Sequence, residues 1–266
     1  MQDDPQRFEH YAPAIRELDL GRIGKPAEIP RRFDLGRDGR LSSHYIPFDH
    51  VNPRARLVLV GITPGFTQWK NAMREAQRQL AAAAPEHVDL AAVKRAGAFS
   101  GTLRPNLIAL LDHIGLQHWL GLASCAALFG AASHLVHTGS ILHHPVFIDG
   151  RNYNGTPNML RTPFLQRQIE AHFAATARAL GPAAVFVPLG PGVSAGIRWL
   201  AQQGVIAPDR VLHGLPHPSG ANVERIAYFL GRKNRATLSA KTNADKLDTL
   251  RHELQAQVRG LDQIID

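Results

Sequence analysis

Residues 56–65 read R-L-V-L-V-G-I-T-P-G, and this stretch decides the fold. Its first half, Arg56 to Val60, is a short apolar run of β-type residues that stops at Gly61. Such a run is typical of a buried strand with a turn at its carboxyl end. The following residues, 66–83, predict a helix that is broken by Pro85. A strand followed directly by a helix indicates an α/β protein.

The same alternation continues along the chain. Strands are expected at residues 121–128, 183–187 and 211–212, and helices at 5–18, 103–114, 163–180 and 193–203. Strands that alternate with helices favour a parallel sheet covered on both faces. We therefore expect a three-layer α/β/α fold around a central, mainly parallel four-stranded sheet. Ligands of such sheets bind beyond the carboxyl ends of the strands, here after Val60, Val187 and Leu212.

The length of 266 residues fits a single domain over 1–266. We expect a core at about residues 44–235, a polar and basic N-terminal extension over 1–43, and a C-terminal helix at about 243–265. Apolar residues recur at helical spacing in that helix, and Thr242 with Asp245 resembles a capping box. Packing on its own domain is favoured over a dimerising coiled coil. Thr162 is similarly expected to cap the helix that starts at Pro163.

Charge and cysteine content narrow the class of protein. Thirty Lys and Arg against 22 Asp and Glu give a net charge of +8, which suits a polyanionic partner, with nucleic acid first. The single cysteine, Cys125, excludes an internal disulfide framework and a cluster held by four cysteines of this chain. Long apolar runs and an N-terminal secretory pattern are both missing from the sequence, so we expect a cytoplasmic protein without a membrane partner.

Two loops at expected strand ends carry the most specific signal. Residues 61–66 read G-I-T-P-G-F and residues 217–222 read H-P-S-G-A-N. Each is weak alone, but the pair resembles the two motifs of the uracil-DNA glycosylase superfamily. Two further stretches agree: G-A-F-S-G at 97–101, before a helix, and V-F-V-P-L-G at 185–190. The resemblance covers about residues 51–233.

The resemblance implies a uracil-DNA glycosylase-like fold and a monofunctional DNA base-excision glycosylase. Such an enzyme hydrolyses the N-glycosidic bond of uracil, or of a related deaminated base, after the base leaves the stack. The expected partner is DNA, uracil-containing or otherwise damaged, single- or double-stranded. We expect no cofactor, no metal and a monomer.

The resemblance also implies roles for individual residues. His217 would donate a hydrogen bond to the leaving base, and Thr63 would hold the attacking water. Phe99 would stack on the base. The expected base-binding residues are Gly61, Ile62, Phe66, Phe99 and Ser124. The expected DNA-binding residues are Ser219, Gly220, Ala221, Asn222, Arg225, Arg232 and Lys233.

Two positions depart from the superfamily pattern. Thr63 stands where the superfamily has Asp or Asn, and a hydroxyl cannot take a proton at neutral pH. Residues 119–125 also lack the asparagine that reads uracil in many members, which leaves Ser124 or backbone groups for that task. Thr63 is therefore also consistent with an alternative function, a catalytically weak or inactive module that binds damaged or single-stranded DNA. A third possibility is an enzyme acting on a nucleoside or a phosphorylated sugar, which basicity disfavours.

Other polar residues invite weaker interpretations. A metal site is disfavoured for His134, His137, His143 and His144, because no cysteine or carboxylate joins them locally. A polar loop is either a cover for the site or a solvated connection; it contains Asn152, Tyr153, Asn154, Asn158 and Arg161. Cys125 is expected to be a small buried residue rather than a nucleophile.

Overall fold

The computed structural model describes residues 7–99 and 103–261, so Ser100, Gly101 and Ile265 of the predicted motifs and helix lie outside the described residues. Contacts group the chain into two compact units that interleave in sequence. The first unit holds the described residues up to Val51, Ile62–Ala98 and Ser140–Thr176; the second holds Asn52–Gly61, Phe99–Gly139 and the chain from Ala177.

The first unit contains an antiparallel sheet. Its strands are β1 (Asp34–Asp38), β2 (Leu41–His44), β5 (Val146–Ile148) and β6 (Arg151–Asn152), in that order. β2 pairs with both β1 and β5, and the Asp149-Gly150 turn joins β5 to β6. The extension expected at residues 1–43 thus supplies two strands of a sheet that the sequence did not predict.

Helices complete the first unit. The expected helix at 66–83 is α2 (Phe66–Leu80), which contacts both α1 (Phe8–Arg16) and α3 (Leu90–Gly97). The helix expected after Pro163 is interrupted: α6 (Pro163–Gln168) passes through a five-residue π turn, Ile169–Phe173, into α7 (Ala174–Ala179). Trp69 of α2 is fully buried and donates its indole N–H to the carbonyl of Tyr45 at 2.9 Å.

A buried polar cluster lies in the same unit. Lys94 of α3 is 5% exposed, and its Nζ donates to the carbonyl of His50 at 2.8 Å. The Tyr45 hydroxyl donates to Asp49 Oδ2 at 2.8 Å. Burial lowers the pKa of Lys94 to about 7, and the opposing attraction of Asp49 offsets only part of that effect. Burial also raises the pKa of Asp49 to about 6. The cluster therefore holds two desolvated titratable groups whose charged forms are costly.

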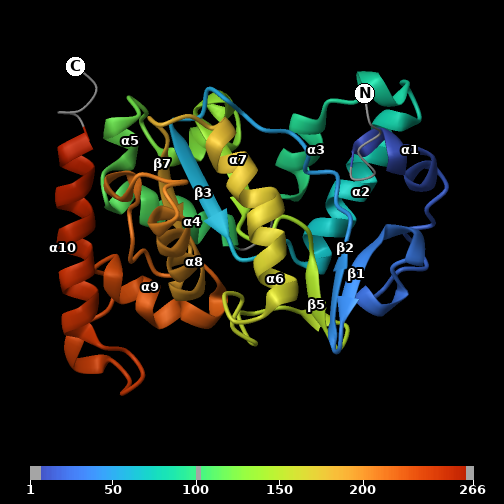
Figure 1. The fold of residues 1–266 in the computed structure, drawn as a ribbon. Coiled ribbons are helices and arrows are strands. Elements are labelled where there is room, and N and C mark those ends of the chain that lie inside the picture. Colours follow the sequence, from blue (N-terminus) through green and yellow to red (C-terminus); the bar gives the residue numbers. More distant parts are fainter. Residues whose placement is uncertain (1–6, 100–102, 262–266) are drawn as a thin grey trace. The chain divides into compact units, whose positions relative to one another are not determined.

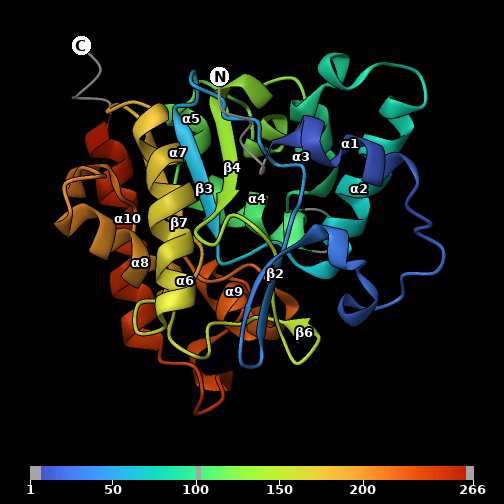
Figure 2. The same ribbon diagram turned by 45° about the vertical axis from the view of Figure 1, so that its right-hand side comes forward.

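The second unit is built on a sheet with the order β4-β3-β7 (Figure 2). β3 (Leu57–Gly61) is buried along its whole length, as the opening stretch of sequence predicts. It pairs in parallel with β7 (Val185–Pro188), from Leu57 opposite Val185 to Val60 opposite Pro188. β4 (Val136–Ser140) lies on the other side of β3. Val211 adds a single parallel bridge to Phe186.

In the described part of the chain, five helices lie wholly within the second unit. α8 (Pro191–Gln202) packs on β7, and α9 (Val223–Phe229) contacts α4 (Leu103–His113). α10 (Ala244–Leu261) lies beside α9 (Figure 1) and contacts α5 (Leu116–Trp119). Leu254 is fully buried, and Val258 and Leu261 are each 3% exposed. The apolar face of the C-terminal helix therefore packs within its own unit, as expected.

Short 3-10 turns connect these elements. They are Pro26–Glu28, Arg31–Phe33, Pro85–His87, Cys125–Phe129, Ser133–Leu135, Pro208–Arg210, Gly220–Asn222 and Arg235–Thr237. In the described part of the chain, no helix is long and apolar enough to cross a membrane.

Two predictions of strands are corrected. The apolar run at 121–128 is not a strand, because Asp112 of α4 accepts hydrogen bonds from the Ser124 hydroxyl and the Cys125 amide and holds the segment in a 3-10 turn. The sheet strand is β4, farther along. The fourth predicted strand, 211–212, is reduced to the Val211 bridge, so the parallel sheet has three strands rather than four.

Two predicted helix caps are also wrong. The Thr162 hydroxyl donates backwards to the carbonyl of Asn158 at 2.9 Å and makes no cap. Asn243, not Thr242, caps α10, because its Oδ1 accepts the amide of Lys246 at 2.9 Å. Thr242 instead donates its hydroxyl to Glu224. Pro163 does occupy the first helical position of α6, as predicted.

Candidate functional site

Thr63, the expected water-holding residue, lies in the first unit between β3 and α2. Its hydroxyl donates to the carbonyl of His144 at 3.0 Å and accepts the amide of Val146 at 2.9 Å. A threonine hydroxyl has one proton and two acceptor lone pairs. One lone pair is therefore left for a water, and the proton is already committed. The hydroxyl fastens the G-I-T-P-G loop to the start of β5.

The polar loop after β6 lies against the same first-unit loop. Asn152 Oδ1 accepts the amide of Phe66 at 3.0 Å, and Gly65 is so close that a Cβ there would meet Asn152 Nδ2 at 3.3 Å. A Cβ on Gly155 would meet Ile62 at 3.5 Å. Residues 152–155 therefore lie against the loop that contains Ile62 and Phe66.

His217 belongs to the second unit, where its loop follows the Val211 bridge. Its Nδ1 accepts the backbone amide of Ser219 at 3.2 Å, and burial lowers the pKa of the half-buried ring. A neutral imidazole that accepts at Nδ1 carries its proton on Nε2. The loop is held from α4, since Asn106 Nδ2 donates to the carbonyl of Pro218 at 3.0 Å. His217 is thus fixed as a neutral ring with Nε2–H as its donor.

Gly190 brings the third motif stretch, at the carboxyl end of β7, against this ring. A Cβ at Gly190 would lie 3.5 Å from His217 Cδ2, and the φ angle of +101° is one that side chains rarely allow. Both motif stretches therefore meet in the second unit, at the start of α8.

A hollow of about 630 Å³ opens beside His217; we call it the basic hollow. Among the described residues that line it, none is Asp or Glu. A Cβ at Gly214 would come within 2.5 Å of Leu250, so the loop and α10 approach each other closely there. The basic and imidazole side chains that line the basic hollow are those of Arg198, His213, His217, Arg225, Lys241 and Lys246. Such a lining creates a positive potential that suits an anion.

The remaining residues of the His217 loop are partly tied to one another. Asn222 Nδ2 donates to the Ser219 hydroxyl at 3.2 Å, and Asn222 Oδ1 accepts from Arg225 at 3.0 Å. Arg225 also donates to the carbonyl of Lys241 at 3.2 Å and remains exposed. Gly220 and Ala221 form an exposed turn at the start of α9. Asn222 and Arg225 of this group line the basic hollow, and Gly220, Ala221 and Arg225 are exposed to a ligand.

Some of the basic residues that follow α9 form ion pairs within the protein. Lys233 donates to Glu224 Oε1 at 2.9 Å, and Arg235 pairs with Asp245 at 2.6 Å. Glu224 also accepts from the Ser239 hydroxyl, which holds the pKa of its carboxyl well below the ordinary value. Lys233 therefore has a structural partner, whereas Arg232 is exposed and has no ion pair within the described residues.

Phe99 and Ser124, two expected base-binding residues, also lie in the second unit. Phe99 is 6% exposed and has a φ angle of +49°, which is uncommon for a non-glycine residue. The Ser124 hydroxyl donates to Asp112 at 2.7 Å and accepts the amide of Ala126 at 3.1 Å. Its hydrogen-bonding capacity is thus largely used by the local turn. Gly61, the last expected base-binding residue, is buried at the end of β3.

The histidines do not assemble with other ligands. His143, His144 and His172 lie with ring centroids 4.7–5.8 Å apart in the first unit. Across the residues that the structure describes, no three His, Cys, Asp or Glu side chains are placed to hold a metal ion. Cys125 is fully buried, as expected, and burial with the neighbouring Asp112 raises the pKa of its thiol.

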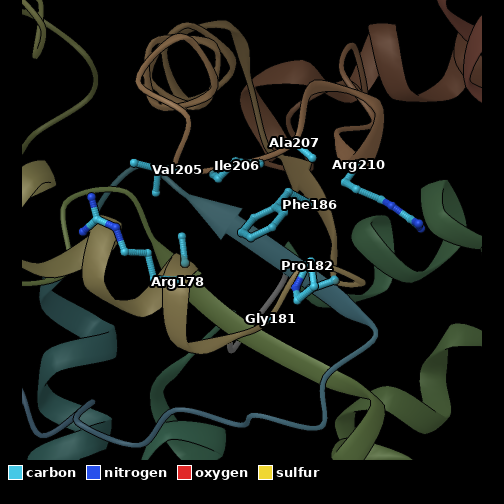
Figure 3. A pocket seen from close by; sticks show the side chains of 10 residues that line it. Arg178, Gly181, Pro182, Phe186, Val205, Ile206, Ala207 and Arg210 are labelled. Atoms are coloured by element: carbon cyan, nitrogen blue, oxygen red, sulfur yellow. The ribbon is translucent and has the colours of Figure 1, made fainter.

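A second, smaller hollow of about 230 Å³ lies around Phe186 of β7. Figure 3 shows the Phe186 ring inside it, while the side chains of Arg178 and Arg210 extend away on opposite sides. Its lining is mainly apolar, with two arginines, and contains fewer basic residues than that of the basic hollow.

Sequence reasoning missed part of the basic hollow. Arg198, His213, Lys241 and Lys246 were assigned no role from the sequence. The usable signal was the H-G-L-P-H spacing at 213–217 after a predicted strand end. The contribution of α10 depends on a contact between distant parts of the chain, which local patterns do not encode.

Comparison with known proteins gives one informative match. The chain is 35% identical over 218 residues to the uncharacterized protein YoxB of Bacillus subtilis (strain 168). The aligned part covers 81% of this chain and 85% of that protein. No family model matches the chain, and no solved structure matches it. At this identity and coverage, the chain belongs to the same protein family as YoxB.

Proposed function

We propose that this protein is a monofunctional DNA base-excision glycosylase with a uracil-DNA glycosylase-like, three-layer fold. It hydrolyses the N-glycosidic bond of uracil, or of a related deaminated base, in DNA. The observation that carries the proposal is His217: a neutral imidazole with its Nε2 proton available, in an H-P-S loop beside a hollow that no described Asp or Glu lines.

The chemistry of the reaction explains why this arrangement is suitable. The bond between the base nitrogen and C1′ breaks, and both electrons go to the base. A water oxygen bonds to C1′ and loses a proton. Negative charge grows on the leaving base, and a fixed N–H donor stabilises such charge. A positive lining adds to this effect and attracts the phosphates of the strand.

The rival function is a module that binds damaged or single-stranded DNA without cleaving it. The observation that favours it is the commitment of the Thr63 hydroxyl to His144 and Val146. That hydroxyl can accept one hydrogen bond from a water but cannot remove its proton. Catalysis would then depend on the stabilisation of the leaving base.

The test is excision from an oligonucleotide that contains one uracil, followed by alkaline cleavage of abasic sites. Strand scission supports the glycosylase. A gel shift without scission supports the binding module. The absence of both scission and a gel shift would contradict both functions. We expect His217→Ala to lower the single-turnover rate about 100- to 1000-fold. His252→Ala is the matched control, because His252 is exposed on α10. Equal rates for both variants would contradict the role of His217.

A further inference from the structure

Besides Arg225, which donates to Asn222 and to the carbonyl of Lys241, three described cations of the basic hollow have no carboxylate partner. Within residues 7–99 and 103–261, neither Arg198 nor Lys241 nor Lys246 forms an ion pair. Lys233 and Arg235, in the same stretch of sequence, are both paired with carboxylates. Three unpaired positive charges around one hollow repel one another, and a bound anion would relieve that repulsion.

The start of α8 adds to the same field. Gly190 and Pro191, the N-cap and first residue of this twelve-residue helix, both line the hollow. The Gly190 position provides no side-chain cap, so the first backbone amides of α8 keep their donors for another acceptor. Ser194, one turn later, is 6% exposed, and its hydroxyl makes no hydrogen bond within the described residues. These donors suit a phosphate.

Part of the lining of the hollow is apolar. Leu215, Pro216 and Leu247 are buried, and Leu250 is half-buried. The volume of about 630 Å³ falls within the range of small-molecule sites. A lining that combines leucines with cations fits a ligand that has a flat or apolar part attached to an anionic group.

We infer that the basic hollow binds a nucleotide, with its phosphate against Arg198, Lys241 and Lys246 and its nucleoside part against the leucines of the lining. The cations from the C-terminal segment, outside the stretch that resembles the glycosylases, are what make this site. The inference concerns binding alone and does not require cleavage of a glycosidic bond. The nucleotide comes either free or as part of a DNA strand, and the phosphate chemistry is the same in both cases.

Calorimetric titration with three small probes tests the inference: uridine 5′-monophosphate, inorganic phosphate and uridine. We expect the monophosphate to bind more tightly than phosphate, and uridine to bind at least about tenfold more weakly than the monophosphate, since each charged hydrogen bond contributes about a factor of ten. Equal affinity for uridine and its monophosphate would overturn the inference, as would a lack of binding by the monophosphate.

Variants locate the site. Arg198→Gln and Lys246→Gln should each weaken monophosphate binding about tenfold. Arg259→Gln removes the same charge from an exposed position of α10 and should leave binding unchanged. If Arg198→Gln and Lys246→Gln bind as the wild type does, the hollow is not the site. All three residues are exposed, so thermal melts should be unchanged.

A single-stranded oligonucleotide distinguishes the two sources of nucleotide. If the same two variants weaken its binding, the DNA strand occupies the hollow; if they weaken only monophosphate binding, the ligand is a free nucleotide. Failure of the glycosylase proposal would appear separately, as absent strand scission with monophosphate binding intact.

Discussion

Replacement of the buried Lys94 by methionine should stabilise the protein at neutral pH. The ammonium is 5% exposed, and burial lowers its pKa from the ordinary 10.5 to about 7. Between those two values the unfolded chain binds a proton that the folded chain does not. The free energy of unfolding therefore rises with pH across this window and is smallest below pH 7.

The size of the effect follows from the same two values. At pH 7 the burial of Lys94 costs about 4 kcal/mol relative to an exposed lysine, taken as an upper bound. Lys94→Met removes that cost, but it also removes the hydrogen bond to the His50 carbonyl and the attraction to Asp49, worth about 1–3 kcal/mol. The net expectation is a gain of about 1–3 kcal/mol at pH 7.

The prediction is measured by urea unfolding of both the wild type and Lys94→Met at about pH 7.0 and about pH 8.5. These values bound the pH range of the comparison. Over that interval, the free energy of unfolding of the wild type should rise by about 1.5 kcal/mol more than that of the variant. Up to the higher pH, most of the ionisation of tyrosine and cysteine in the unfolded chain has not yet occurred. The ionisation that does occur affects the wild type and the variant equally, so it cancels when the two proteins are compared. Lys246→Met, at an exposed lysine, should change stability by less than about 0.5 kcal/mol. A less stable Lys94→Met protein whose pH dependence parallels the wild type would refute the reasoning.

Three further predictions concern the framework and the surface. Thr63→Val should cost about 1–3 kcal/mol in urea unfolding, because it leaves the His144 carbonyl and the Val146 amide without their partner, whereas Thr63→Ser should keep most of that stability. Leu254→Ala should cost about 2–5 kcal/mol by the same measurement, since this side chain of α10 is fully buried; a cost below about 1 kcal/mol would mean that α10 is not part of the core. DNA affinity should fall with salt, and Arg225→Gln and Arg232→Gln should each reduce the logarithmic slope by about 0.7–0.9 in filter binding. An unchanged slope in both variants would place the phosphate contacts elsewhere.

Local periodicity predicted those parts of the fold that are stabilised by local pattern. β3 is apolar throughout because both of its faces are covered, and α2, α4 and α10 show an apolar face at helical spacing. β4 was missed because V-H-T-G-S has no apolar run. The apolar residues at 121–128 were predicted to form a strand and do not. Asp112 of α4 accepts hydrogen bonds from the Ser124 hydroxyl and the Cys125 amide, a contact that the local pattern does not reveal.

The same distinction separates the predicted and missed parts of the candidate site. The two motif loops are contiguous in sequence, so their residues were found. The state of each side chain depends on distant partners: Thr63 on His144 and Val146, and Lys233 on Glu224. A motif identifies which residue is present, but not which of its hydrogen-bonding groups is already used.

That difference bears directly on how a glycosylase with this first loop would act. An aspartate in place of Thr63 would accept the proton of the attacking water, whereas the Thr63 hydroxyl donates a hydrogen bond to the backbone carbonyl of His144 and keeps a single free lone pair. The water would be oriented but not activated, so most of the rate enhancement would have to come from the leaving base. His217 has the properties that this task needs, because the Ser219 amide occupies Nδ1 and burial keeps the ring neutral. A protonated histidine would also donate, but a cation buried beside Arg225, Lys241 and Lys246 would raise the repulsion that already surrounds the hollow. The neutral donor is therefore the form compatible with both the electrostatics and the chemistry.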